Sequence, residues 1–410
     1  MNTEKIMKLF EDTSYNRTSC SPEEHKTAEY LLQQCEEMGI SARLEPFSVA
    51  QGEIESAALV CDGREIPCKG YECCGNGEIE APLYYLPNRD PWSLSRCRGN
   101  IVLTDDYLGY WLYQDLLANG AVGFITYDGS VNYADDDISR RQLRPSTHKG
   151  NKLPGVNINA KAASALVKQE ASSVKISIRQ KEYEGTSYNV IADIPGERED
   201  VILFTAHYDS TSLSVGAYDN MSGCIGLLAM AEYFQAHKPK YSLRFLWCGS
   251  EEQGLLGSRA FAEAHKEELG KYAFCINLDM IGTGMGKFRA VCTSEKKLVS
   301  YLQYAAMEYG FGMEAVQDVY SSDSTPIADE GVPAVTFVRW TNSSTGTIHN
   351  RYDTIDLISP QQMVRDIDFI TFFASRMANA SQLPVAREIP ENMKIELDDY
   401  LSRKRKPKED

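Results

Sequence analysis

The chain has 410 residues, with 42 Lys or Arg and 58 Asp or Glu, so its formal net charge is −16. A hydrophobic fraction of 43% and a charged fraction of 24% are typical of a globular protein, and they exclude a disordered chain, a collagen and a simple coiled coil. The acidic balance argues against nucleic acid or an anionic membrane as the main partner, because both require basic surface. The length predicts two or three domains.

Neither a membrane segment nor a secretory leader is visible. No run approaches the roughly 18 apolar residues of a membrane helix, and the first residues lack the apolar core of a signal peptide. The 11 cysteines are scattered, and the densest group, Cys61, Cys68, Cys73 and Cys74, contains no CxxC pair. We therefore expect reduced thiols, no structural metal at that group, and a cytoplasmic protein.

The first part of the chain divides into a helical segment and a strand-rich segment. Residues 22–39 are typical of an amphipathic helix, because Leu31, Leu32 and Met38 recur at helical spacing before Gly39. We expect residues 1–44 to be the helical start of the main domain. Residues 45–185 combine short apolar runs with turns rich in Gly, Asn and Asp, which predicts a smaller inserted domain.

From residue 186 to residue 384, strand-like runs alternate with helical ones. This alternation predicts an α/β domain with a mixed, mostly parallel central sheet flanked by helices. The predicted strands are Val201–Ala206, Leu243–Cys248, Ala273–Leu278 and Ala334–Val338, and the main predicted helices are Ser222–Ala236, Glu295–Tyr309 and Gln361–Ala380. Residues 385–410 are expected to form a charged tail, with a solvated basic run at residues 403–408.

Acidic residues and histidines follow the ends of these predicted strands. In open α/β sheets, ligands bind beyond the carboxyl ends of the strands, so these side chains are expected to share one crevice. They are His207 and Asp209 after the first strand, Asp219 before the next helix, Glu251 and Glu252 after the second strand, Asp279 after the third, and His349 and Asp353 after the last.

Such a cluster requires a compensating cation, since buried unpaired charges are very costly. Imidazole and carboxylate together suit zinc and related metals. One carboxylate can bridge two ions about 3.5–4 Å apart, so that each ion also takes a His and a further carboxylate, and one Glu remains as general base. Asp209 lies two residues from His207, so it is either a ligand or a partner that orients the imidazole.

Five segments together resemble the co-catalytic zinc aminopeptidase family. This family includes the aminopeptidase S and aminopeptidase Y types and is related to the glutamate carboxypeptidases and the transferrin receptor. The resemblance covers about residues 186–380 in order. The segments are His207–Ser210, Gly216–Gly223, Ser250–Ser258, Asn277–Gly282 and Ile348–Thr354.

The resemblance implies a zinc exopeptidase fold, two Zn²⁺ per chain, and peptide substrates with a free N-terminus. It implies hydrolysis by a water that bridges the metals, and a cis peptide bond between Asp219 and Asn220. The roles it implies are His207 and Asp279 on one zinc, Glu252 and His349 on the other, Asp219 as the bridge, Asp209 as support for His207, and Glu251 as general base.

Two further observations concern the rest of the chain. Several family members have a Tyr before the last His ligand, where this chain has Ile348, so the donor to the oxyanion is open; Tyr352 is one nearby phenol. Segments 98–103, 116–125 and 153–156 resemble the protease-associated domain, which implies a lid or substrate-selection role for residues 45–185. The sequence indicates no oligomeric state.

Other functions compete with the aminopeptidase. A carboxypeptidase would require a basic pocket for the substrate carboxylate, to which Arg339 or Arg351 is near enough in sequence to contribute. Glutaminyl cyclisation on a single zinc is disfavoured by the full two-metal ligand set. A non-catalytic receptor on the same fold is disfavoured because every ligand position and the base are filled.

Overall fold

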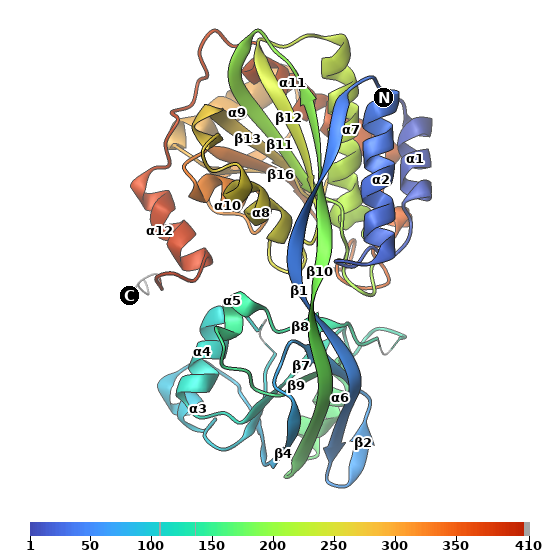
Figure 1. Ribbon diagram of the computed structural model, residues 1–410, viewed down its shortest axis with the longest axis vertical. Coiled ribbons are helices and arrows are strands. Elements are labelled where there is room, and N and C mark those ends of the chain that lie inside the picture. Colours follow the sequence, from blue (N-terminus) through green and yellow to red (C-terminus); the bar gives the residue numbers. More distant parts are fainter. Residues whose placement is uncertain (106–107, 136, 406–410) are drawn as a thin grey trace. The chain divides into compact units, whose positions relative to one another are not determined.

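The computed structural model describes residues 1–105, 108–135 and 137–405 (Figure 1). The chain divides into two compact units, one formed by Met1–Phe47 and Thr186–Asp410 and the other by Ser48–Gly185. Among the described residues, no helix combines the length and the apolar character that crossing a membrane requires.

The first unit is built on a mixed sheet whose central strands are parallel. In this sheet β11 pairs in parallel with β12 and with β13, β13 pairs in parallel with β16, and β14 pairs in parallel with β15. The pairs β10–β12 and β14–β16 are antiparallel. The order is β15 (Glu314–Gln317), β14 (Lys287–Thr293), β16 (Ala334–Trp340), β13 (Tyr272–Leu278), β11 (Arg198–His207), β12 (Tyr241–Cys248), β10 (Val174–Ile194) and β1 (Ser41–Cys61). Strands β1 and β10 extend into the residues of the second unit, which also contains β2 (Arg64–Ile66), the antiparallel partner of β1. The predicted mostly parallel central sheet is confirmed.

Helices cover both faces of this sheet, because its central strands are apolar on both sides. Ile202 and Phe204 of β11 belong to one core cluster, and Leu203 between them belongs to another. The larger cluster includes side chains of α1 (Thr3–Asp12), α2 (Pro22–Glu37), α7 (Ser222–Ala236), α9 (Lys296–Tyr309) and α11 (Pro360–Ala378). The smaller one includes side chains of α8 (Leu256–Ala264), α10 (Ser324–Asp329) and α12 (Glu391–Tyr400).

The helix termini follow the local sequence. Ser21 caps α2 by accepting a hydrogen bond from the Glu24 amide, and Pro22 occupies the first turn, where its missing N–H costs nothing.

The expected charged tail contains α12, whose Met393 and Leu397 are buried. Residues 406–408 of the basic run lie outside the described residues.

The second unit has its own sheet and its own core. Ile101, Phe124 and Val156 are fully buried in a cluster formed by this unit. Its six-stranded sheet has the order β5 (Leu83–Tyr85), β6 (Ile101–Leu103), β7 (Gly123–Asp128), β9 (Gly155–Asn159), β3 (Lys69–Glu72) and β8 (Arg141–Gln142), while β4 (Gly77–Ala81) pairs with β10. Its helices are α3 (Pro91–Ser95), α4 (Tyr110–Ala118), α5 (Pro145–His148) and α6 (Ala160–Lys168). Its identity as a protease-associated domain stays a prediction.

Candidate metal centre and active site

Loops at the carboxyl ends of four parallel-sheet strands carry the candidate site residues. β11 ends at His207, β12 ends just before the loop with Glu251 and Glu252, and β13 ends immediately before Asp279. His349 lies in the long loop after β16. The structure brings the predicted residues together at one edge of the sheet, as expected for parallel strands.

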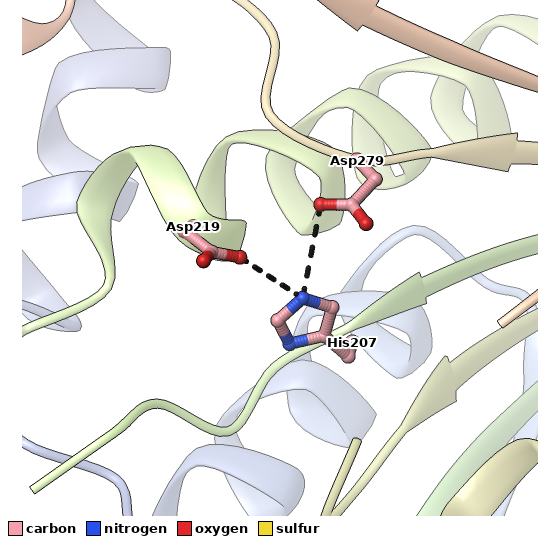
Figure 2. A group of neighbouring side chains, drawn as sticks. All are labelled: His207, Asp219 and Asp279. Atoms are coloured by element: carbon pink, nitrogen blue, oxygen red, sulfur yellow. Dashed lines mark ion pairs between the residues drawn. The ribbon is translucent and has the colours of Figure 1, made fainter. Parts of the chain in front are cut away.

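The side chains form two groups that share one carboxylate. In the first group, His207 Nε2 lies 3.2 Å from Asp219 Oδ1 and 3.8 Å from Asp279 Oδ1 (Figure 2). In the second, His349 Nε2 lies 3.1 Å from Asp219 Oδ2 and 3.2 Å from Glu252 Oε2. Asp219 therefore offers a different oxygen to each group, which is the geometry of a bridging carboxylate.

The donor set fits divalent cations. Each group has one imidazole nitrogen and two carboxylate oxygens within 4.8 Å of one another, the mixed set that zinc favours. Asp279 Oδ1 is buried and accepts no hydrogen bond from any described residue. Burial alone would lower the pKa of His207, but Glu251, Asp209 and Asp219 outweigh it and raise that pKa well above its ordinary value. This group of side chains therefore favours positive charge.

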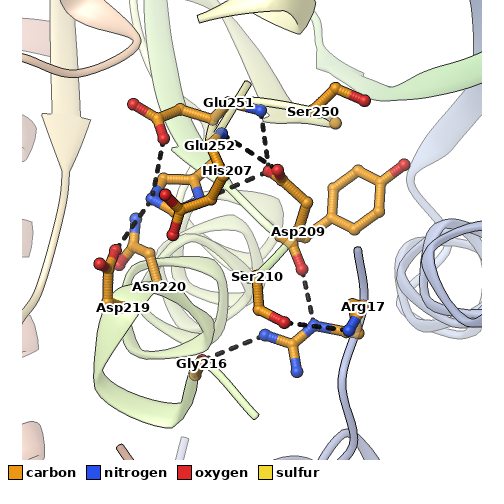
Figure 3. Close-up of polar contacts among 12 residues, drawn as sticks. Arg17, His207, Asp209, Ser210, Gly216, Asp219, Asn220, Ser250, Glu251 and Glu252 are labelled. Atoms are coloured by element: carbon orange, nitrogen blue, oxygen red, sulfur yellow. Dashed lines mark hydrogen bonds and ion pairs between the residues drawn. The ribbon is translucent and has the colours of Figure 1, made fainter. Parts of the chain in front are cut away.

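Asp209 joins the histidine loop to the glutamate loop. Its Oδ1 accepts a hydrogen bond from the Glu251 amide at 2.9 Å and its Oδ2 accepts one from the Glu252 amide at 3.1 Å (Figure 3). The same Oδ1 lies 3.5 Å from His207 Nδ1, on the side of the ring away from Asp219. Asp209 is completely buried and belongs to neither ligand group, so its contacts favour the orienting role over the ligand role.

Asp353 fixes the backbone that leads into the shared carboxylate of Asp219. Its carboxylate accepts hydrogen bonds from the Tyr218 amide at 2.8 Å, the Asp219 amide at 3.2 Å and the Ser214 hydroxyl at 3.2 Å. Burial, with the charge of Asp219 second, raises the pKa of Asp353 to about 7. The Asp219–Asn220 peptide bond is cis, which confirms that prediction.

Glu251 differs from its neighbour. Its Oε2 lies 3.9 Å from His207 Nε2, and it belongs to neither ligand group. Burial raises the pKa of Glu251 well above its ordinary value; the charge of Glu252 adds to this rise and His207 opposes it. A buried carboxyl beside the two groups, held by its backbone to Asp209, has the placement of an acid–base group.

Three residues near the site were not predicted. Arg17 and Glu24, from the N-terminal segment, contact the loops that carry the site residues. Tyr320 is partly buried, and burial followed by the charges of Asp279 and Asp219 raises its pKa above the ordinary value. No local sequence pattern marks Arg17 and Glu24, because their partners Tyr208 and Ser250 lie far along the chain.

Comparison with known proteins agrees with this geometry. Residues 189–373 match Peptidase family M28. The chain is 25% identical to Aminopeptidase YwaD of Bacillus subtilis (strain 168), over 92% of this chain and 84% of that protein. It is 34% identical to Leucine aminopeptidase 2 of Arthroderma otae, over 40% of this chain and 32% of that one.

Solved structures share the fold along nearly the whole chain. The structure of BSAP, a zinc aminopeptidase from Bacillus subtilis, superposes with a TM-score of 0.77 at 23% identity, covering 96% of this chain and 99% of that one. An aminopeptidase from Aneurinibacillus sp. strain AM-1 superposes with a TM-score of 0.76 at 22% identity, covering 94% and 96%. The residues that match Peptidase family M28, 189–373, carry both ligand groups.

Proposed function

We propose that the protein is a zinc-dependent aminopeptidase that holds two zinc ions and hydrolyses N-terminal residues from peptides. The observation that carries this proposal is the pair of ligand groups that share Asp219. The similarity to Aminopeptidase YwaD along most of both chains supports it.

The chain's own residues divide the work. His207 and Asp279 would hold one ion, Glu252 and His349 the other, and Asp219 would contact both. Bound metal would lower the pKa of a water molecule towards neutrality and polarise the scissile carbonyl.

Glu251 is the residue placed to move the proton. It lies beside the ligand groups without belonging to either, so its carboxylate is available to accept a proton from water. The same carboxyl would then protonate the leaving amine, as one residue does in many hydrolases. Asp209 holds the Glu251 amide, and this contact limits where that carboxylate can point.

The charge of the site favours a substrate with a free amino group. An ammonium is attracted by a carboxylate cluster, whereas a substrate carboxylate needs a basic partner. Arg339, one of two arginines considered for that role, is 8% exposed and forms a buried ion pair with Asp366 through Nη2 at 2.5 Å and Nε at 2.7 Å. Its charge is already neutralised, which weakens the carboxypeptidase alternative.

The test compares three matched substrates. A leucine p-nitroanilide with a free amino group, its N-acetylated form, and an N-blocked dipeptide with a free C-terminus are assayed with and without a chelator. We expect cleavage of the first substrate alone, its loss on chelation, and recovery when zinc is restored. Cleavage of the N-blocked dipeptide in preference to the free amine would favour the carboxypeptidase, and chelator-resistant cleavage would exclude a metal mechanism.

A further inference from the structure

The segment between α1 and α2 lies against the loop 208–216, called the aspartate loop here, which contains Asp209 and leads to Asp219. Arg17, in this segment, is fully buried. Its guanidinium donates hydrogen bonds to three carbonyls of this loop, those of Tyr208 (2.6 Å), Val215 (2.5 Å) and Gly216 (3.1 Å). Figure 3 shows Arg17 beside Ser210 and Gly216, with Asp209 on the other side of the same loop.

The contact between this segment and the loop is reciprocal. The Arg17 amide donates to Ser210 Oγ at 2.9 Å, and the Ser210 amide donates to the Arg17 carbonyl at 3.0 Å. The Asn16 side chain donates to the carbonyls of Ser212 and Ser214, each at 3.0 Å. Both ends of the loop 208–216 are therefore held, and this loop contains Asp209 and leads to Asp219.

Glu24 makes the corresponding contact to the glutamate loop. Glu24 is 1% exposed, and its Oε1 accepts hydrogen bonds from the Ser250 amide (2.9 Å), the Ser250 hydroxyl (3.1 Å) and the Ser187 hydroxyl (2.9 Å). Its Oε2 accepts one from the Cys20 amide at 2.6 Å. Ser250 has a positive φ of 53° and directly precedes Glu251, so its conformation sets where the glutamates start.

We propose that Arg17 and Glu24 are positioning residues, which act as an N-terminal brace to hold the aspartate loop and the glutamate loop in the geometry that binds metal and aims Glu251. The expected effect on catalysis rests on the proposed function. The expected effect on metal binding rests only on the geometry of the ligand groups. Residues that orient metal ligands typically change metal affinity or activity by about 10–100-fold when they are replaced.

Lysine cannot take the place of Arg17. The guanidinium has five N–H donors in a planar fork and faces five carbonyls, because Thr13 and Tyr15 accept bonds from Nη1 in addition to the three of the loop. An ammonium has only three donors at a single point and would leave buried carbonyls without a partner. Glutamine at position 24 would in turn direct an N–H towards donors that need an acceptor.

The test uses the full-length variants Arg17→Lys and Glu24→Gln. Arg244→Lys is the matched control for the first, because Arg244 is half-buried and donates to Asp193 and Tyr272, away from the catalytic loops. Glu72→Gln is the control for the second, because Glu72 is a buried carboxylate that pairs with Arg140 inside the second unit. Zinc affinity is measured by competition with a chromogenic chelator, kcat and KM are measured on the free-amino substrate, and thermal unfolding is followed on metal-free protein.

We expect zinc affinity and kcat to fall by about 10–100-fold in both brace variants, with KM near wild type and both controls unchanged in affinity and kcat. Folded variants that keep wild-type zinc affinity and kcat would overturn the brace, as would variants that lose only thermal stability. If Arg17→Lys does not fold, Glu24→Gln decides. If the wild-type protein cleaves no peptide but the variants still bind zinc more weakly, the proposed function is refuted and the positioning role of Arg17 and Glu24 stands.

Discussion

Glu251 and Glu252 are neighbours in sequence, yet their carboxylates have different surroundings. Both amides donate to Asp209, so the two residues start from one fixed point. Glu252 Oε2 lies 3.2 Å from His349 Nε2. Glu251 Oε2 lies farther from the nearest imidazole of the ligand groups, 3.9 Å from His207 Nε2. Figure 3 shows the two side chains separating from the Asp209 carboxylate. We interpret Glu252 as a ligand and Glu251 as the base.

This division predicts a dissociation between metal loss and activity loss. Glu251→Gln keeps the size of the side chain but removes the proton acceptor, so turnover should fall by about 10²–10⁴-fold while zinc content stays near wild type. Glu252→Gln should instead release zinc from one site. Zinc content by elemental analysis, measured beside kcat, checks both variants. Zinc loss in Glu251→Gln with zinc retained in Glu252→Gln would mean that the roles are reversed.

Tyr320 is a phenol that the charges of the site influence. Its ring packs edge-on against Trp340, with the centroids 6.4 Å apart. Because burial and the nearby carboxylates of Asp279 and Asp219 raise its pKa, the phenol stays protonated at neutral pH and remains a hydrogen-bond donor. Tyr352, considered from the sequence, is 37% exposed.

Several family members have a Tyr at the position of Ile348. We predict that in this chain Tyr320 donates the hydrogen bond to the oxyanion instead. Tyr320→Phe should lower kcat by about 10²–10³-fold, as the loss of one oxyanion donor does, and leave zinc content unchanged. Tyr352→Phe is the control and should stay near wild type. Steady-state kinetics on the free-amino substrate distinguish the two, and a large effect in Tyr352→Phe alone would reassign the donor.

At the scale of elements, the site depends on how the loops after β11 and β12 are joined. Asp209 is completely buried between them and uses both carboxylate oxygens on the glutamate loop. An amide at this position has only one acceptor oxygen, and it would present an N–H group to one of the two backbone donors.

Asp209→Asn should accordingly disturb both ligand loops while the sheet below remains intact. We expect zinc affinity to fall by about 10–100-fold, because Asp209 also faces His207 Nδ1 and favours the tautomer that leaves Nε2 available. Competition with a chelator measures the affinity, and near-ultraviolet circular dichroism checks the fold. Wild-type affinity in a folded Asp209→Asn protein would show that Asp209 does not orient the imidazole.

The elements that the sequence predicted best are those with strong local patterns. The helix expected at Ser222–Ala236 has those bounds, and the four predicted strands lie within β11, β12, β13 and β16. The predicted site residues gather because parallel strands end at one edge, which the alternation of strands and helices already implies. Arg17 and Glu24 escaped prediction because their partners lie about 190 and 226 residues away, and such pairings exist only after folding.

At the scale of the whole molecule, the second unit has the features of an independent module. Its buried residues form a cluster of their own, and its sheet pairs β7 with both β6 and β9 in parallel register. A fragment spanning Ser48–Gly185 should therefore unfold cooperatively in urea, bind no zinc and cleave no peptide. Zinc-dependent cleavage by this fragment would contradict the assignment of the chemistry to the first unit, and non-cooperative unfolding would contradict its independence.

The central claim is that two ions share Asp219, and the most direct test is to measure bound zinc and activity together in wild type and in Asp219→Ala. The account predicts two zinc ions per wild-type chain, activity that disappears on chelation and returns with zinc, and the loss of at least one ion and of turnover in Asp219→Ala, because neither group then keeps its ligand set. An Asp219→Ala protein that retained two zinc ions and full turnover would contradict it.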